Sequence, residues 1–133
     1  MDKLYSIQQI TEITGLSAHT LRYYEKIHLI HDIQRDPKGY RQYTDTDILW
    51  LDFLVRLRET GMSIQDMKAF ADLRSQGDHT VALRKQLLQS HYQLVQSQID
   101  QQQQHLNKIA DKVNHYTQLE EQVDLSTIGK DSE

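Results

Sequence analysis

The chain has 133 residues, a formal net charge of −4, 38% hydrophobic residues and no cysteine. This length fits one domain with an appended element, and no run approaches the roughly 20 apolar residues of a membrane-spanning helix. The absence of cysteine excludes disulfides, thiolate metal sites and iron–sulfur clusters within the chain. Because the N-terminus also lacks a signal-peptide pattern, we expect a cytoplasmic protein without membrane partners.

Two short helices joined by a glycine are predicted at the start of the chain. Ser6 and Gln9 fit a capping box, and Gly15 suits the left-handed residue that ends a helix. Ser17 then fits the N-cap of a second helix. Two helices in this arrangement are typical of a helix-turn-helix, whose second helix enters the major groove of DNA.

The second helix is predicted to have a buried face and an exposed face. Its apolar residues recur near the helical period, namely Leu16, Leu21, Tyr24 and Ile27. The residues left on the outer face are His19, Thr20, Arg22, Tyr23 and Lys26. This outer face combines basic and aromatic side chains, which favours contact with nucleic acid.

A short hairpin is predicted after this helix, because residues 36–39 (DPKG) fit a type I turn between two extended runs. A helix followed by such a hairpin is typical of a DNA-reading helix followed by a wing. The segment 19–43 carries five Lys or Arg residues against three Asp or Glu residues. We therefore expect modest affinity for DNA with a strong salt dependence.

Two further helices are predicted to support this segment. Thr44 and Asp47 fit the capping pattern of a third helix, Gly61 ends it, and Ser63 caps a fourth. The third helix is apolar around much of its circumference, so we expect it to be the central helix of the domain. Trp50 is expected to be one of its core residues.

One long helix is predicted from Thr80 to about Val123, since no glycine or proline interrupts this segment. Val81, Leu88, Val95, Gln102, Ile109 and Tyr116 share one heptad position, and Tyr92, Ile99, Leu106 and Val113 share another. This seam predicts a homodimeric coiled coil, in which Gln102 could set the register; the pattern does not fix the orientation. We expect a DNA-binding domain at 1–76, a dimerisation helix at 77–123 and a flexible tail at 124–133.

Four segments together resemble the MerR family of bacterial transcription regulators. They are residues 20–25 (TLRYYE), residues 39–43 (GYRQY), residues 57–63 (LRETGMS) and the terminal coiled coil. The resemblance implies a winged-helix dimer joined by an antiparallel coiled coil. It also implies binding to a pseudo-palindromic promoter operator whose over-long spacer is bent and untwisted, so that RNA polymerase on the same DNA can engage both promoter elements.

The resemblance also implies a set of DNA-binding residues. Thr20, Arg22 and Tyr23 would meet the major groove and its phosphates. Arg35, Tyr40 and Arg41 would be wing contacts to the DNA backbone, and Lys38 in the wing turn joins this set. The alternative interpretation of these positions is a solvated helix face and an ordinary exposed turn.

The nearest subgroup is the aldehyde-responsive one, which residues 77–81 (GDHTV) and Arg84 resemble. Members of that subgroup often carry a reactive cysteine in the third helix, and Arg56 occupies that place here. Metal-sensing members carry cysteines at the end of the dimer helix, and this chain has none. A small-molecule effector stays a possible partner, without a thiol to sense it.

No metal, cofactor or catalytic activity is predicted. His91, His105 and His115 are fourteen and ten residues apart, which does not match the i, i+4 spacing of two ligands on one helix face. The chain also contains no nucleophile-elbow glycines and no phosphate-binding loop.

Two alternative functions are left open by the sequence. One is a DNA-architectural, excisionase-like protein that bends DNA without an effector, and the long dimer helix argues against it. The other is a coiled-coil adaptor whose N-terminal domain binds protein, and such an adaptor would not be retained on heparin.

Overall fold

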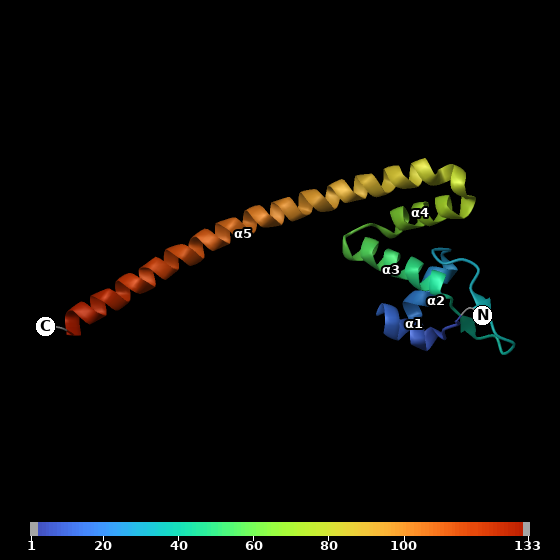
Figure 1. Ribbon diagram of the computed structural model, residues 1–133, viewed down its shortest axis with the longest axis horizontal. Helices are drawn as coiled ribbons and strands as arrows, with labels where there is room; N and C mark the ends of the chain where they lie inside the picture. The colour runs from blue at the N-terminus through green and yellow to red at the C-terminus, as the bar shows by residue number, and fades with distance from the viewer. Residues whose placement is uncertain (1–2, 132–133) are drawn as a thin grey trace. The chain divides into compact units, whose positions relative to one another are not determined.

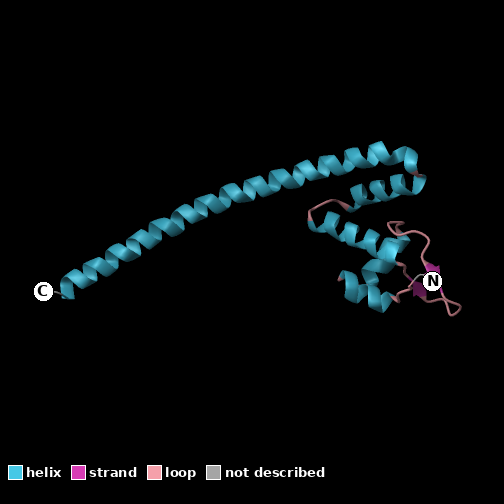
Figure 2. Ribbon diagram, viewed as in Figure 1, coloured by secondary structure: helices cyan, strands magenta, loops and turns pink. Residues whose placement is uncertain are grey.

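The computed structural model describes residues 3–131. The elements in chain order are α1 (Ile7–Thr14), α2 (Ala18–Lys26), β1 (Gln34–Arg35), β2 (Arg41–Gln42), α3 (Asp45–Glu59), α4 (Ile64–Gln76), the 3-10 helix η1 (Asp78–Thr80) and α5 (Val81–Asp131) (Figures 1 and 2). The predicted fold class, all-α with a small β-wing, is confirmed. Internal contacts divide the chain into an N-terminal unit, which ends at His91, and a C-terminal unit, which begins at Tyr92.

The first two helices form where their caps predicted them. The Ser6 hydroxyl accepts a hydrogen bond from the Gln9 backbone N–H at 3.1 Å, and the Gln9 side chain accepts from the Ser6 N–H at 2.9 Å. Gly15 ends α1 with φ of +77°, in the left-handed region where glycine has no steric penalty. The Ser17 hydroxyl then caps α2 by accepting from the Thr20 N–H at 3.0 Å.

The core of the N-terminal unit is built around α3. Leu51 and Leu54 of α3 are fully buried, as are Ile10 of α1 and Leu21 of α2. Complete burial of such a side chain is worth about 1.5–3 kcal/mol relative to exposure. The prediction that Trp50 belongs to the core is confirmed, since it is 8% exposed and its indole N–H donates to the Leu29 carbonyl at 2.7 Å.

The wing is a two-stranded antiparallel hairpin in which Gln34 pairs with Gln42 and Arg35 with Arg41. The predicted turn at residues 36–39 is confirmed, because the Gly39 N–H donates to the Asp36 carbonyl at 2.9 Å. The Asp36 carboxylate stiffens the turn by accepting from two backbone N–H groups, each at 2.9 Å. We therefore expect the wing tip to keep its shape before it meets a partner.

The junction between α4 and α5 is held by a buried threonine. Thr80 is 2% exposed, and its hydroxyl lies 2.7 Å from the carbonyl oxygens of both Leu73 and Gly77. The same hydroxyl accepts from Arg84 Nε at 3.1 Å. Leu87, one turn further along α5, packs against the core, so the start of α5 belongs to the N-terminal unit.

The 51 residues of α5 make a helix of about 75 Å. It continues to Asp131, beyond the end near Val123 that the sequence predicted. The flexibility expected of residues 124–133 stays a prediction. The single glycine in this stretch, Gly129, costs an established helix only about 1 kcal/mol. The last two residues of the predicted tail, 132–133, lie outside the described residues.

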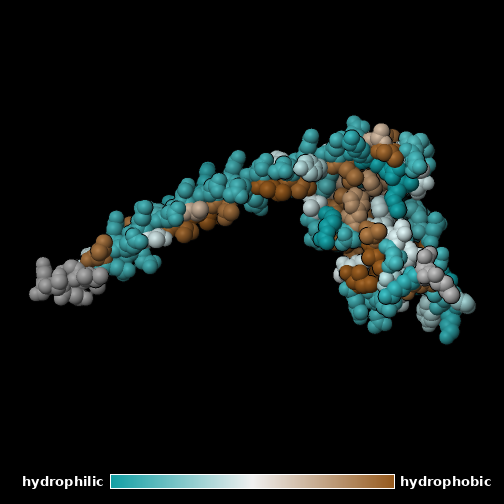
Figure 3. Space-filling model, viewed as in Figure 1, coloured by the Kyte–Doolittle hydropathy of each residue, from teal (hydrophilic) through white to brown (hydrophobic). Residues whose placement is uncertain are grey.

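Apolar side chains recur along α5, as the brown patches of Figure 3 show. None of the helices among residues 3–131 is long and apolar enough to cross a membrane. The division of the chain into three domains at residues 76 and 123 stays a prediction.

One hydroxyl in the core of the N-terminal unit has no hydrogen-bond partner within the described part of the chain. It belongs to Tyr43, which is fully buried and follows the wing. Burial raises the pKa of the Tyr43 phenol. The folded state therefore favours the neutral phenol, and this contribution to stability is lost as pH rises above the ordinary tyrosine range towards the raised pKa.

We expect Tyr43→Phe to leave the free energy of unfolding unchanged or to raise it by up to about 1 kcal/mol, because it removes an unsatisfied buried donor. Urea denaturation at one fixed protein concentration measures this. The control is Tyr5→Phe, which removes a hydroxyl that donates to Asp45 Oδ1 at 2.8 Å and should lower stability. A loss of more than about 1 kcal/mol in Tyr43→Phe would contradict the assignment of an unsatisfied hydroxyl.

Candidate nucleic-acid interface

The outer face of α2 has the residues that its periodicity predicted. Leu21 and Tyr24 are buried, whereas Arg22 and Tyr23 are exposed. Thr20 differs from the expectation, because it is only half-exposed and its hydroxyl accepts from the Ser17 hydroxyl at 2.9 Å. His19 and Lys26 are exposed as well, so the outer face of α2 carries basic, aromatic and imidazole side chains.

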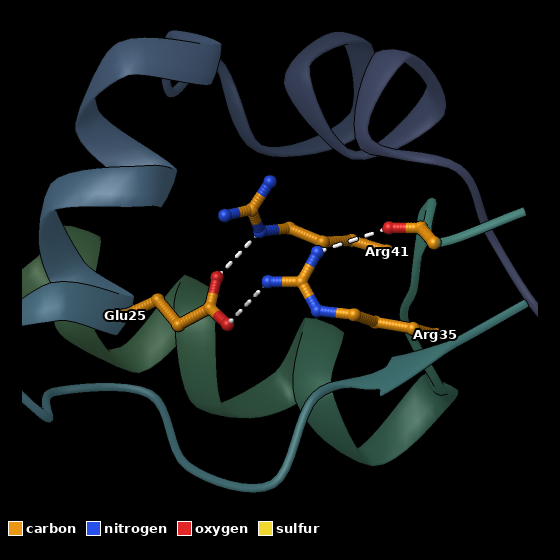
Figure 4. Close-up of polar contacts among 4 residues, drawn as sticks. Glu25, Arg35 and Arg41 are labelled. Atoms are coloured by element: carbon orange, nitrogen blue, oxygen red, sulfur yellow. Dashed lines mark hydrogen bonds and ion pairs between the residues drawn. The ribbon is translucent and has the colours of Figure 1, made fainter.

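Two wing arginines converge on one carboxylate of α2 (Figure 4). Glu25 Oε1 accepts from Arg35 Nη2 at 3.3 Å, and Glu25 Oε2 accepts from Arg41 Nε. Arg35 Nη1 also donates to the Gly39 carbonyl in the wing turn at 3.0 Å. We call Glu25, Arg35 and Arg41 the Glu25 clamp, and it ties the wing to α2.

The Glu25 clamp keeps a surplus positive charge, since two guanidinium groups share one carboxylate. Each guanidinium has five N–H donors, and among the described residues the hydrogen bonds use one from Arg41 and two from Arg35. The side chain of Arg35 is 45% exposed, and that of Arg41 is 23% exposed. The remaining donors can bind phosphate oxygens while the clamp stays closed.

The tip of the wing is open to solvent. Tyr40 is 69% exposed, and Lys38 is also exposed. The structure thus gathers Arg35, Lys38, Tyr40 and Arg41 on one short hairpin, as the sequence predicted. The set of DNA-binding residues predicted from the sequence does not include Glu25, although this residue stands in the TLRYYE segment. Its contacts depend on residues ten and sixteen positions away.

A hollow of about 190 Å³ lies beside α2, next to the start of α4. Thr20 and Tyr23 line it together with Arg58 and Ile64. Arg58 Nη1 lies 3.4 Å from the Tyr24 hydroxyl, which makes this guanidinium a neighbour of α2. Sequence reasoning did not assign Arg58 a role, although it lies in the LRETGMS segment.

The histidines of α5 have separate surroundings. His91 Nε2 lies 2.8 Å from the Thr60 hydroxyl, whereas His105 and His115 are exposed. Within residues 3–131, no group of three or more His, Cys, Asp or Glu side chains is arranged to hold a metal ion.

Two family models match the chain. The model described as MerR HTH family regulatory protein matches residues 5–73, and the model described as MerR, DNA binding matches residues 48–112. The first covers the helix-turn-helix, the wing and most of α4, and the second extends into α5. The resemblance drawn from the four sequence segments is confirmed.

Related proteins agree with this family. An uncharacterized HTH-type transcriptional regulator from Haemophilus influenzae is 37% identical over 112 residues, which are 84% of this chain and 83% of the relative. The regulator AdhR from Bacillus subtilis is 40% identical over 83 residues, which are 62% of this chain and 59% of AdhR. These relatives are regulators of transcription rather than enzymes.

Solved structures share the fold. HiNmlR, a MerR family regulator lacking the sensor domain and bound to promoter DNA, has a TM-score of 0.79 and 35% identity over 87% of this chain and 92% of its own. A protein from Listeria monocytogenes classed in the MerR family has a TM-score of 0.87 and 30% identity over 97% of this chain and 99% of its own. The fold, from the helix-turn-helix and wing to the long helix α5, is thus shared along almost the whole chain. The chain belongs to the MerR family of transcription regulators.

Proposed function

We propose that the protein regulates transcription by binding promoter DNA as a homodimer, with α2 in the major groove and the wing against the adjacent backbone. The observation that carries this proposal is the Glu25 clamp, which fixes two basic wing residues to the recognition helix. The likeness to HiNmlR, which is bound to promoter DNA, supports the same use of the fold.

The exposed side chains divide into two roles. Arg22 and Tyr23, with the half-exposed Thr20, read base edges and hold the phosphates beside them. The wing residues Arg35, Lys38, Tyr40 and Arg41 bind the DNA backbone, which fixes the orientation of the protein without reading sequence. The operator is a pseudo-palindrome, because two copies of α2 related by a two-fold axis meet two half-sites.

The mechanism proposed is deformation of the DNA between the half-sites. Protein that holds two half-sites firmly can bend and untwist the spacer, and the deformation energy depends on the spacer sequence. A promoter whose elements are too far apart then becomes usable by RNA polymerase bound to the same DNA. Rigid wings serve this mechanism, since a flexible wing would follow the DNA instead of bending it.

The apolar row on α5 supports the homodimer. Residues at heptad spacing are exposed by more than half of their surface, namely Tyr92, Ile99, Leu106, Ile109, Val113 and Tyr116. Val95 is half-exposed, and Leu88 packs in part against the core of the N-terminal unit. Such a seam is the usual contact surface of a coiled coil, and a second copy of α5 covers it. The family resemblance favours antiparallel pairing.

Nuclease footprinting of the purified protein on the DNA upstream of its own gene tests this function. We expect protection of a pseudo-palindrome between promoter elements, with enhanced cutting at its centre where the DNA is distorted. The absence of protection at low salt would exclude the proposal. Protection without any change in transcription would instead indicate an architectural protein.

Arg22→Ala is expected to weaken binding to the operator at least about tenfold and to reduce discrimination between operator and unrelated DNA, because α2 reads base edges. Lys38→Ala, which removes an exposed charge of the wing and leaves the Glu25 clamp intact, is expected to lower affinity for both DNAs alike and to reduce the slope of log affinity against log salt by about one unit. Fluorescence anisotropy with operator and scrambled duplexes measures both effects. Unchanged operator affinity in Arg22→Ala would exclude α2 as the recognition helix.

Glu25→Gln is expected to raise affinity for scrambled DNA and to reduce the ratio of operator to scrambled affinity at least about threefold. The substitution adds net positive charge and leaves a single amide oxygen to hold two guanidinium groups. Asp111→Asn is the control, since it removes an exposed carboxylate of α5. An unchanged affinity ratio in Glu25→Gln would show that the clamp acts through charge alone.

Ile99→Asp is expected to convert the dimer into a monomer and to weaken operator binding at least about tenfold, because it puts a charge into the seam. Gln101→Asp is the matched control, since it adds the same charge to an exposed position off the seam. Sedimentation velocity measures the oligomeric state. A dimer that persists in Ile99→Asp would exclude this seam.

A further inference from the structure

A cavity of about 580 Å³ lies in the N-terminal unit, on the wall of the core formed by Trp50. Its walls come from the loop after α2, from α3, from the end of α4, from η1 and from the first turns of α5. Its ionisable and aromatic lining residues are His31, Asp32, Asp47, Trp50, Arg74, Asp78 and Arg84. We call this space the Trp50 cavity. Its volume falls within the roughly 300–1,000 Å³ of small-molecule sites.

The Trp50 cavity has three carboxylates without an ion-pair partner. Among residues 3–131, the side chains of Asp32 and Asp78 form no hydrogen bond or ion pair, and Asp47 uses one oxygen to accept from the Thr44 N–H at 2.9 Å. Carboxylates in this state can accept further hydrogen bonds from a cation. The lining therefore has free acceptors and an excess of negative charge over its two arginines.

Arg84 does not neutralise these carboxylates directly. Its Nε donates to the Thr80 hydroxyl at 3.1 Å, and its Nη2 lies 3.4 Å from the Gly77 carbonyl. Both partners are uncharged groups at the junction of α4 and α5. Arg84 is thus bound to that junction and, among the described residues, forms no ion pair with the carboxylates of the cavity. These carboxylates stay available to another cation.

The guanidinium of Arg74 already occupies one position that suits a cation, over the Trp50 ring. The carbon of its guanidinium lies 4.2 Å from the centroid of the Trp50 ring. Within the described part of the chain, the Arg74 side chain has no hydrogen bond and no ion pair, and the residue is exposed. Its hold on the ring is a single cation–π contact, which is weak at an exposed site.

The Trp50 ring itself is rigidly placed. Its N–H donates to the Leu29 carbonyl, and the Phe70 ring stacks on it with centroids 6.0 Å apart. A rigid aromatic face beside unpaired carboxylates is the usual setting for recognition of an organic cation. A metal ion is not suited to this site, because no metal-ligand group of three acidic or histidine residues occurs among residues 3–131.

We propose that the Trp50 cavity binds a small organic dication of the guanidine or amine class, and that this ligand displaces the Arg74 guanidinium from the Trp50 ring. One cationic group takes the place of Arg74 on the ring, and the other pairs with the free carboxylates. Asp32 lies two residues before strand β1, so the ligand contacts the loop that leads into the wing. The inference does not rest on the DNA-binding function.

Agmatine, which carries a guanidinium and an ammonium group, is the probe. Trp50 is the only tryptophan of the chain, so its fluorescence reports on this cavity alone. The full chain without DNA is titrated at constant ionic strength. We expect a saturable change in fluorescence with agmatine and none with N-butylurea, which has a similar shape but no charge. No saturable change with agmatine, or an equal change with N-butylurea, would overturn the proposal.

Two variants test the displacement. Arg74→Ala is expected to bind agmatine about two- to fivefold more tightly, because a competing exposed cation–π contact typically costs 0.5–1 kcal/mol. Asp32→Asn is expected to bind at least about fivefold more weakly, and asparagine tolerates the positive φ of 58° at this position. Asp111→Asn, remote in sequence from the cavity residues, is the matched control and should not change the affinity.

Circular dichroism melting of each variant shows whether it is folded, so a loss of binding cannot be attributed to unfolding. Weaker or unchanged agmatine binding in folded Arg74→Ala would overturn the displacement. Because the titration contains no DNA, its failure leaves the footprinting result untouched, and a failed footprint leaves the titration untouched.

Discussion

The burial of α3 is the constraint on which the N-terminal unit depends. Leu51 and Leu54 are fully removed from solvent, and they hold the helices that come before and after α3. Trp50, on the same helix, also fixes the loop that follows α2, because its indole N–H donates to the Leu29 carbonyl. A helix-turn-helix is too small to be stable by itself, so packing against α3 fixes the positions of α1 and α2.

A carboxylate on α2 would ordinarily oppose the DNA binding proposed for this helix, since it repels phosphate. The repulsion between Glu25 and phosphate is offset, because two guanidinium groups pair with this carboxylate and leave the cluster positively charged. Glu25 therefore fixes the side chains of Arg35 and Arg41 in place without making the cluster negative. This arrangement also explains how a chain with a net charge of −4 can present a basic surface, since the distribution of charge matters more than its sum.

Local signals in the sequence were sufficient to predict the helices and strands. They did not predict the contacts between residues that are far apart in the chain. The caps at Ser6, Ser17 and Thr44 predicted three helix starts, because a cap satisfies N–H groups within three residues. The contacts of Glu25 with the wing and of Arg74 with Trp50 join residues 10 to 24 positions apart, and no periodicity encodes them. The end of α5 was also missed, because helix propensity changes only gradually along that stretch.

The hydrogen bond between His91 and Thr60 joins α5 to the turn that follows α3. The Thr60 hydroxyl lies 2.8 Å from His91 Nε2 and donates to the Arg56 carbonyl at 2.7 Å. This contact therefore ties the turn after α3 to the last residue of α5 that belongs to the N-terminal unit.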